Sequence, residues 1–520
     1  MEPSTEREFK YLVDPDHGLT ENAIDELIGA AIGRNHPRDH ARLLPPAIRI
    51  LTAGYWDTAE LSLLRHGHTL RYRSAADGSE TGWTLKLHGA TSNGLTIRQE
   101  IHFKGSSKSP PLAALSLVRA VVRSAPLEPI VTLKTTRREI VVVDDLGQPT
   151  LRVDDDHVDI IEGGHSIESF HEIEIEVLND EGLEDAERVA KCLRRAGADG
   201  SNPKPKLERA LHGRLESPAE PTTLGKKCSS TDLIAWAITR SLTALIRHDP
   251  FTRLGHDPEE LHLARVAIRR LRSDLRTVAP VLDGDWVSSV RLELDWIADG
   301  LGAVRDLDVL RERFVGQIGV LDSGDLAGFE ALLAELHSQR SEARRKLLVG
   351  LDSPRYVELL DRLEFASRTP DFFVDGEKGS SARDVLVHVC RATWKRVVKT
   401  VDDCGSTSWE DVPEVRLHAI RRRVKQARYS AELAAAVIGK RADRHARALS
   451  RLQDDLGELQ DSAVASAWLH EQGRATLDPA VAFVAGLLCE LQQSEASKAR
   501  KQCYQSWLKA SSTASASWLE

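Results

Sequence analysis

The spacing of apolar residues changes once along this 520-residue chain, and that change restricts the possible folds more than any other feature. Up to about residue 178, apolar and polar residues alternate in short runs between Gly, Pro and Asp turns, as they do in β-strands. Beyond about residue 230, apolar residues recur every three or four positions, as they do in amphipathic helices. The sequence therefore predicts a β-rich N-terminal part and an all-α C-terminal part.

The segment between these parts has the composition of a linker. Residues 212–230, HGRLESPAEPTTLGKKCSS, are rich in Pro, Ser, Thr and Gly and follow neither spacing. The whole chain is also too long for one ordinary hydrophobic core. We therefore expect an N-terminal domain over residues 1–212, a linker over 213–228 and a helical domain over 229–512.

Eight runs in the N-terminal part alternate as strands do: EREFKYLV, IRILTAGYW, HTLRYRS, GWTLKLH, LTIRQEIHF, IVTLKTTRREIVVV, PTLRVDDDHVDII and FHEIEIEVL. Eight antiparallel strands can close into a barrel that leaves no strand edge unpaired. Helical spacing interrupts the runs near residues 21–32, 112–123 and 185–195. The expected fold class of this domain is α+β, an eight-stranded antiparallel barrel with flanking helices.

Charged residues of both signs share single faces of these strands. Glu6, Glu8 and Lys10 alternate in the first run, so the pleat points all three to one side. The same spacing recurs at Arg71 and Arg73, Arg98 and Glu100, Lys134 and Arg138, Asp154 and Asp156, and Glu172, Glu174 and Glu176. On one strand alone, a solvated outer face with ion pairs across strands explains such a pattern. Its recurrence favours a closed polar lumen.

Mixed charge in a closed lumen fits a particular chemistry. Arg and Lys neutralise a triphosphate through charge-assisted hydrogen bonds, whereas carboxylates alone would repel it. The carboxylates fit if Mg²⁺ or Mn²⁺ bridges them to phosphate oxygens and activates a water molecule. The pattern therefore predicts acids that bind metal and bases that bind phosphate.

Several of these runs also resemble a known family. EREFK, YWDTAELSLLRHGHTLRYR, TLKLHG, RQEIHF, HEIEIEV and PKLERAL are similar, in order, to the signature of the CYTH family of triphosphate tunnel enzymes. The resemblance covers roughly residues 1–212 and implies a tunnel that binds triphosphate-containing substrates with a divalent metal and hydrolyses or cyclises them.

The resemblance implies roles for particular residues. The metal site would comprise Glu6, Glu8, Glu100, Asp154, Asp156, Glu172 and Glu174, and the phosphate-binding bases would be Lys10, Arg71, Arg73, Lys86, Arg98, Lys134, Arg138 and Lys206. We expect Glu6, Glu8, Lys10 and Glu174 to be the catalytic group. His102 and Arg152 stand where acids are common in the family, and which of Asp154, Asp155 and Asp156 faces the tunnel stays open.

The helical part repeats itself. HLARVAIRRLRSDLR from His262 is echoed by HAIRRRVKQARYSAE from His418, an offset of 156 residues. LGAVRDLDVL from Leu301 is echoed by LGELQDSAVA from Leu456, an offset of 155. Two unrelated motifs at nearly one offset indicate two helical bundles related by duplication, over about residues 229–380 and 381–512.

Each repeat carries a basic stripe. His262, Arg265, Arg269, Arg272 and Arg276 follow helical steps of three and four, as do His418, Arg421, Lys425 and Arg428, with Arg422 beside them. Stacked like charges repel, so the stripes predict either a polyanionic ligand or pairing with acids of neighbouring helices such as Asp306, Asp308 and Asp461.

These repeats resemble the CHAD domain, a helical domain named partly for its histidines. The resemblance covers about residues 229–512 and implies two four-helix bundles around a basic channel that binds inorganic polyphosphate. CHAD domains commonly follow CYTH domains in one chain. The second repeat has Gln460 where the first has Arg305, so we expect the two halves to be unequal.

Composition narrows the class of protein further. A net charge of −9 argues against a general nucleic-acid binder, and no apolar run is long enough to predict a membrane helix. The six cysteines form no Cys-x-x-Cys pair and so indicate neither a zinc site nor a disulfide framework. With no secretory signal visible, we expect a cytoplasmic protein that associates with polyphosphate granules.

Three functions remain open on the sequence alone. The favoured one is a metal-dependent triphosphatase, acting on inorganic triphosphate or a small organic triphosphate, coupled to a polyphosphate-binding domain. The alternatives are a non-catalytic protein that binds or is targeted to polyphosphate, and an adenylate cyclase that uses the same metals and bases. The sequence does not indicate the oligomeric state.

Overall fold

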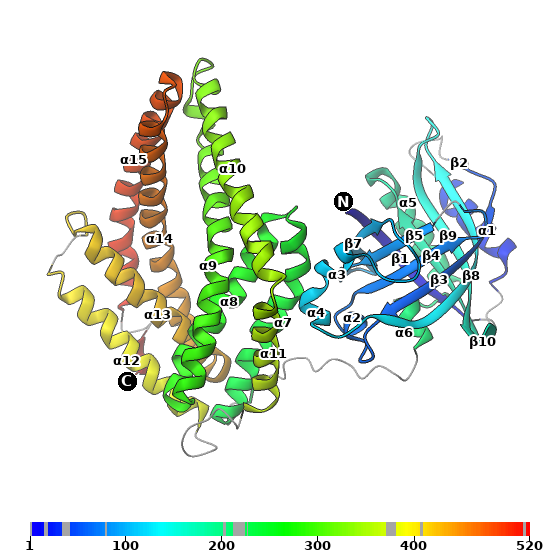
Figure 1. The fold of residues 1–520 in the computed structure, drawn as a ribbon, viewed down its shortest axis with the longest axis horizontal. Helices are drawn as coiled ribbons and strands as arrows, with labels where there is room; N and C mark the ends of the chain where they lie inside the picture. Colours follow the sequence, from blue (N-terminus) through cyan, green and yellow to red (C-terminus); the bar gives the residue numbers. More distant parts are fainter. Residues whose placement is uncertain are drawn as a thin grey trace. The chain divides into compact units, whose positions relative to one another are not determined.

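The fold is described from a computed structural model, which forms two compact units, residues 1–218 and 219–520 (Figure 1). The structure describes residues 3–14, 19–33, 42–78, 81–200, 204–211, 224–225, 227–370, 381–405, 409–512 and 516–519. Most of the linker expected over 213–228 lies outside these residues. Each unit is described by itself.

The first unit is a closed antiparallel barrel. Its described strands are β1 (Ser4–Val13), β2 (Arg42–Leu43), β3 (Ala47–Asp57), β4 (Thr69–Ala75), β5 (Thr81–Lys86), β6 (Ala90–Ser92), β7 (Leu95–Phe103), β8 (Glu128–Val143), β9 (Pro149–Glu162) and β10 (His165–Val177). Neighbouring strands follow the order β1-β10-β9-β8-β3-β4-β5-β7, and the pairing of β1 with β7 closes the barrel. The predicted eight-stranded barrel is confirmed. The short strands β2 and β6 add to β8 and β7.

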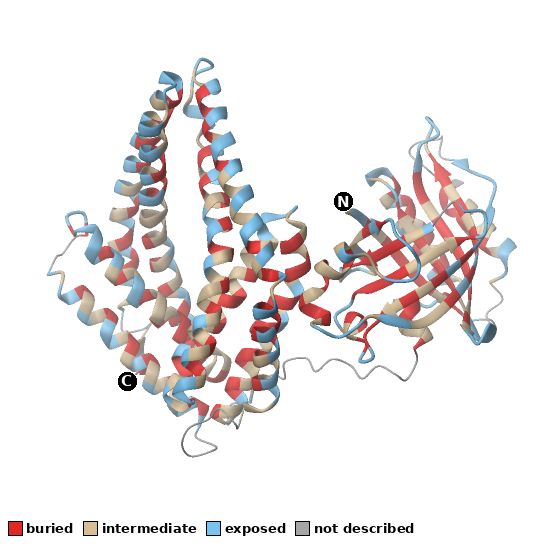
Figure 2. Cartoon of the chain, viewed as in Figure 1, coloured by how far each residue is buried: buried red, intermediate tan, exposed pale blue. Residues whose placement is uncertain are grey.

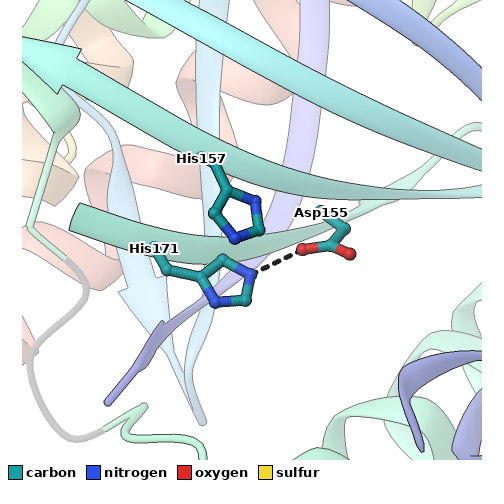
Figure 3. Close-up of side chains that lie close together, drawn as sticks. All are labelled: Asp155, His157 and His171. Atoms are coloured by element: carbon teal, nitrogen blue, oxygen red, sulfur yellow. Dashed lines mark hydrogen bonds and ion pairs between the residues drawn. The ribbon is translucent and has the colours of Figure 1, made fainter. Parts of the chain in front are cut away.

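The pleat separates a charged inner face from a mixed outer face. In β9, Asp154 and Asp156 contact Arg137 inside the barrel. The intervening Asp155 lies on the outer face with His157, beside His171 of β10 (Figure 3). Of the three consecutive aspartates, Asp154 and Asp156 therefore face the lumen, and Asp155 does not.

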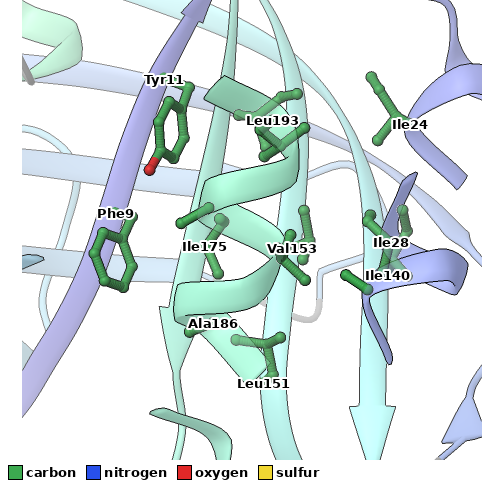
Figure 4. Packing of buried hydrophobic residues seen from close by; sticks show 14 of the residues in the cluster. Phe9, Tyr11, Ile24, Ile28, Ile140, Leu151, Val153, Ile175, Ala186 and Leu193 are labelled. Carbon is green, nitrogen blue, oxygen red and sulfur yellow. The ribbon is translucent and has the colours of Figure 1, made fainter. Parts of the chain in front are cut away.

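Two helices cover part of the outer face. α1 (Glu21–Gly33) and α5 (Leu183–Arg195) lie over β1, β8, β9 and β10, where Ile24, Ile28 and Leu193 join the apolar side of the strands (Figure 4). Burying these side chains provides the main stabilisation of the barrel wall. The helical spacing near residues 112–123 forms two short helices, α3 (Leu112–Leu117) and α4 (Arg119–Val122).

Part of the inner face is apolar rather than charged. Leu64 after β3 and Leu207 of α6 (Lys206–Ala210) pack with Tyr55, Leu133 and Val158. The short helix α2 (Ser62–Arg65) carries Leu64 into this cluster. Because Leu207 anchors α6 there, the preceding Lys206 is buried among the charged residues of the lumen.

The second unit is all-α and duplicated. Its described α-helices are α7 (Ser230–Leu254), α8 (Pro258–Val278), α9 (Gly284–Val315), α10 (Leu326–Leu351), α11 (Pro354–Arg368), α12 (Ala382–Asp402), α13 (Glu414–Ile438), α14 (Lys440–Ala475) and α15 (Pro479–Ala510). α13 and α14 each begin 156 residues after α8 and α9. The four helices α7 to α10 thus correspond to α12 to α15, and α11 is an additional helix of the first repeat.

The longest helices pair across the repeats. Phe314 and Phe329 of the α9–α10 hairpin share an apolar cluster with Trp468 and Val484 of the α14–α15 hairpin. Gly328 permits this approach, because a Cβ there would lie 2.6 Å from the Ala480 carbonyl oxygen. Figure 2 shows buried residues along these helices and exposed ones on their outer sides. In the described part of the chain, no helix has the length and apolar character needed to cross a membrane.

Candidate functional site

The barrel lumen is lined almost entirely by charged side chains. They include Glu6, Glu8, Lys10, Arg71, Arg73, Lys86, Arg98, Glu100, Arg137, Arg152, Asp154, Glu174, Glu176 and Lys206. They come from seven strands and from α6, so residues as far apart in sequence as Glu6 and Lys206 share one lumen. Closing the sheet is what concentrates them.

One group of ion pairs surrounds Glu6. Its two carboxylate oxygens accept hydrogen bonds from Lys86 Nζ at 2.6 Å and from Arg98 Nε at 2.7 Å. Arg98 also contacts Glu8, and Lys86 lies 3.7 Å from Glu100. Burial alone would raise the pKa of Glu6, but Lys86 and Arg98 lower it below its ordinary value. Glu6 is therefore an anion at neutral pH despite its burial.

A second group surrounds Lys206. Its ammonium lies 2.5 Å from Glu172, 2.8 Å from Glu174 and 3.1 Å from Asp156. Burial alone would lower the pKa of Lys206, but these three carboxylates raise it well above its ordinary value. The ammonium thus balances part of a cluster of buried negative charge.

The same three carboxylates have the donor chemistry of a metal site. Oxygen atoms of Asp156, Glu172 and Glu174 lie within 4.8 Å of one another, and Mg²⁺ and Mn²⁺ prefer such ligands. The residues therefore fit a hard divalent cation. An ion bound there would take over contacts that Lys206 makes.

Arg137 links the second group to β9. Its guanidinium donates two hydrogen bonds to Asp156, at 2.8 and 2.7 Å, and also contacts Asp154 and Glu174. Lys10 contacts Glu174 as well. Each acid of this group shares its cation with another acid, so moving one side chain changes the balance of charge around several others.

Two of the expected phosphate-binding bases lie elsewhere. Lys134 is exposed and is not part of the lumen lining. Arg138 lies on the outer face, where it contacts Asp155 at 3.2 Å and Asp25 of α1 at 2.7 Å. Both expectations placed the wrong face of β8 inside the barrel. The pleat gives Lys134 and Arg138 the same side as Ile140, which packs under α1.

Arg137 occupies the lumen position in their place, and the sequence reasoning did not select it. Glu176 and Tyr55 were also not selected as site residues, although both line the lumen. The sequence of β8 held no clear signal for this choice, because residues 140–143 are apolar at four consecutive positions. The packing of Ile140 and Val142 in the helix-covered cluster shows that residues of the other parity, Arg137 among them, face inward.

The helical unit brings its two basic stripes together. Arg269 of α8 and Arg421 of α13 both lie near Lys425 of α13, and their positive charges lower its pKa. Burial is the largest cause, Arg265 and Arg272 add to it, and the pKa of Lys425 falls to about 8. Because α8 packs against α13, the two stripes form one basic surface between the repeats, which we call the basic groove: Arg265, Arg269, Arg272, Arg421 and Lys425.

Pairing with acids neutralises part of this surface. Arg265 lies 3.4 Å from Asp306, Arg272 contacts Asp295, and Arg428 lies 2.7 Å from Glu432. Asp308 instead pairs with Arg340. Among the described residues, no carboxylate lies within 4.0 Å of the cationic groups of Arg269, Arg276, Arg421 or Lys425. Internal pairing therefore accounts for only some of the charges.

The remaining stripe residues lie at the ends of the surface. His262 is half-buried on α8, and burial lowers its pKa. His418 and Arg422 are exposed on α13 and line, with Arg421, a pocket of about 650 Å³ between α13, α14 and α15. His418 Nδ1 lies 3.0 Å from Gln460 Oε1 in that pocket.

Comparisons with known proteins match both units. The model of the CYTH domain matches residues 5–202, and the model of the CHAD domain matches residues 237–470. The uncharacterized protein Rv2226 of Mycobacterium tuberculosis is 26% identical over 476 residues, which are 87% of this chain and 88% of that protein.

Solved structures similar to the chain include two that match about half of it. The CHAD domain of the plant Ricinus communis has 23% identity and a TM-score of 0.46, covering 57% of this chain and 97% of that one. PptA of Streptomyces chartreusis has 22% identity and a TM-score of 0.45, covering 54% of this chain and 100% of that one. On the matches to the two family models, the chain belongs to the proteins in which a CYTH domain is followed by a CHAD domain.

Proposed function

We propose that the barrel is a metal-dependent triphosphatase that hydrolyses inorganic triphosphate or a small organic triphosphate. The observation that carries this proposal is the arrangement of Asp156, Glu172 and Glu174 within 4.8 Å of one another, in a lumen that also holds Arg and Lys side chains. Such a lumen provides oxygen ligands for a cation and positive charge for phosphates in the same space.

The division of labour follows from the side chains. Arg71, Arg73, Lys86 and Arg98 provide hydrogen-bond donors and positive charge for phosphate oxygens. Asp156, Glu172 and Glu174 would hold Mg²⁺ or Mn²⁺, and the ion would supply Lewis-acid polarisation of a phosphoryl oxygen and a lowered pKa for a water molecule. Lys206 and Arg137 then neutralise charge that develops on the reacting phosphates.

The test is phosphate release by the full chain from inorganic triphosphate, ATP and other nucleoside triphosphates, with Mg²⁺, with Mn²⁺ and with EDTA. Cyclic nucleotides are measured in the same reactions. Metal-dependent phosphate release without cyclic product supports the proposal. A cyclic product with pyrophosphate would instead establish a cyclase, and triphosphate binding without any product would establish a binding protein.

We propose further that the basic groove binds inorganic polyphosphate, at polyphosphate granules in the cytoplasm. The observation that supports this is that, among the described residues, Arg269, Arg421 and Lys425 have no carboxylate within 4.0 Å of their cationic groups, and crowding by the arginines of α8 and α13 together with burial lowers the pKa of Lys425 to about 8. Bringing like charges together costs free energy that a linear polyanion would recover. Binding of labelled polyphosphate to the full chain, measured by anisotropy against rising salt, tests the proposal. Affinity that does not depend on salt would contradict it.

A further inference from the structure

A compact group of metal-ligand side chains lies on the outer face of the barrel (Figure 3). Asp155 and His157 belong to β9, and His171 belongs to β10. His157 and His171 are direct partners in the register of the two strands, and their rings stack with centroids 4.1 Å apart. One ligand atom of each residue lies within 4.8 Å of the other two.

This group is separate from the lumen. Because alternate residues of a strand point to opposite faces, Asp155 and His157 point away from Asp154 and Asp156. His157 is exposed, whereas Asp155 is 1% exposed. An ion could therefore reach the two imidazoles from solvent without entering the lumen.

The carboxylate of Asp155 is held in one orientation. Its Oδ2 accepts a hydrogen bond from Arg138 Nε at 3.2 Å, and its Oδ1 lies 2.6 Å from His171 Nε2. Arg138 is itself fixed by Asp25 at 2.7 Å and by the Glu21 carbonyl oxygen at 3.0 Å. Asp25 offsets the charge of Arg138, so Oδ1 stays directed at the imidazoles with little net positive charge nearby. Fixed partners of this kind orient metal ligands.

We propose that Asp155, His157 and His171 bind a transition-metal ion of the Zn²⁺ class. Two imidazoles and one carboxylate suit Zn²⁺, Ni²⁺ or Cu²⁺, whereas Mg²⁺ prefers oxygen ligands alone. Zn²⁺ binds nitrogen and oxygen at about 2.0–2.2 Å. The paired strands hold the three backbones in place, and the stacked imidazoles would have to turn out of their parallel arrangement for both to direct a ring nitrogen at one ion. A fourth position is left for water.

Such an ion would join β9 to β10 on the face that α1 borders. Ligands that bind only the folded state stabilise it in proportion to the logarithm of their concentration over Kd. The ion would therefore raise the unfolding temperature of the barrel. This role is independent of triphosphate hydrolysis.

The experiment uses tag-free full chain that carries Glu172→Gln and Glu174→Gln, so that the lumen no longer competes for the ion. Zn²⁺ affinity is measured by competition with a chromophoric chelator, and Co²⁺ is added separately to record its visible absorption spectrum. We expect one Zn²⁺ per chain and a rise in melting temperature. Adding His157→Ala should weaken Zn²⁺ binding by at least about 100-fold. Mutating a group that only orients a metal ligand can already cost up to about 100-fold in affinity, and removing the ligand itself should cost no less.

His165→Ala is the matched control, because His165 is also exposed on β10 but lies outside the group. This control should bind Zn²⁺ with the affinity of its parent. His157 is exposed, so its removal leaves the core intact, and circular dichroism of both variants checks this. Equal Zn²⁺ affinity of the His157→Ala and His165→Ala variants would overturn the proposal, as would a Co²⁺ spectrum unchanged by His157→Ala.

Discussion

The barrel lumen and the basic groove both gather positive charge, but they balance it differently. In the lumen, Lys206 contacts three carboxylates, and Arg137 contacts two of these and also Asp154. In the groove, Lys425 lies near four arginines and its pKa falls to about 8. The lumen is a compensated network, whereas the groove carries excess charge of one sign.

This difference predicts different requirements for binding an anion. A phosphate chain entering the lumen must break buried ion pairs, which leaves carboxylates unpaired unless a cation replaces the lost partner. The same chain meeting the groove relieves repulsion and releases counterions. Binding of a phosphate chain in the lumen should therefore require divalent metal, and binding to the groove should not. Added salt should lower the affinity of the groove for the chain far more than that of the lumen.

The largest expected effect is on hydrolysis when an acid of the lumen loses its charge. Glu6→Gln and Glu174→Gln should each lower kcat by at least about 100-fold, because each removes charge that positions the cation or its neighbouring bases. Polyphosphate binding by the groove should not change. Initial rates of phosphate release with Mg²⁺ and Mn²⁺ provide the measurement.

Glu168→Gln provides a matched control, because Glu168 is exposed on the same strand as Glu174. It should hydrolyse triphosphate at the parent rate. Parent rates for both lumen variants would mean that these acids take no part in the reaction. The lumen would then be a binding site alone.

The second effect concerns the groove. Replacing Arg269, Arg272, Arg421 and Lys425 together by Ala should remove most polyphosphate binding in EDTA. The slope of log affinity against log salt should fall by about 3, since each lost phosphate contact removes about 0.7. Triphosphate hydrolysis should persist. Anisotropy titrations of the full chain at several salt concentrations test both statements.

The control removes the same number of charges from exposed positions of the same unit: Lys395, Arg396, Lys399 and Arg441. If this variant loses as much affinity as the groove variant, net charge rather than the groove governs binding. Unchanged affinity in a helical groove variant would contradict the proposed polyphosphate site.

The third effect separates the two faces of β8. Arg137→Met should lower kcat/KM by about 10-fold or more, since it removes charge from the lumen and leaves Asp156 with fewer partners. Arg138→Met should have little effect on kcat/KM, because Arg138 contacts Asp155 and Asp25 on the outer face. Equal losses in the two variants would contradict the assignment of the faces. Melting temperatures of both variants separate loss of activity from loss of fold.

The same strand shows how far the sequence could predict the structure. Alternation located the eight main strands, because each is at least six residues long. The sequence did not predict β2 and β6, because strands of two or three residues are too short to show an alternating pattern. Lys134 and Arg138 were assigned to the wrong face, because β8 carries basic residues on both faces and only the helices packed on Ile140 distinguish them.

The helical unit shows a similar limit. The motif offsets of 156 and 155 residues agree to within one residue with the 156 residues that separate the starts of α8 and α13 and of α9 and α14. These offsets could not reveal α11, which has no counterpart among the helices that the structure describes in the second repeat. The stripes suggested a shared groove, but the proximity of Lys425 to Arg269 depends on how α8 packs on α13, and no local pattern encodes that contact.

The smallest expected effect is a proton taken up when polyphosphate binds. With a pKa of about 8, Lys425 is largely neutral at pH 9 in the free protein. Nearby phosphates raise that pKa toward its ordinary value of 10.5, so binding at pH 9 should take up close to one proton, and binding at pH 7 none. Folding of the free protein has the opposite effect on this proton, because Lys425 loses it more readily in the folded state than in the unfolded chain. Between pH 8 and 10.5 the unfolded chain therefore holds more protons, and the folded state gains stability as pH rises.

Calorimetry at pH 9 in two buffers with different ionisation heats measures this uptake. Lys425→Met should abolish it and lower polyphosphate affinity by about 30-fold at pH 9, which is less than the loss at pH 7, because at pH 9 part of the binding free energy is spent on protonating the neutral lysine. Lys395→Met, which removes an exposed lysine of α12, should leave the uptake as it is in the parent. Uptake that persists in the Lys425→Met variant would assign the proton to another group. The basic groove would then lack the crowded lysine that distinguishes it from the compensated lumen.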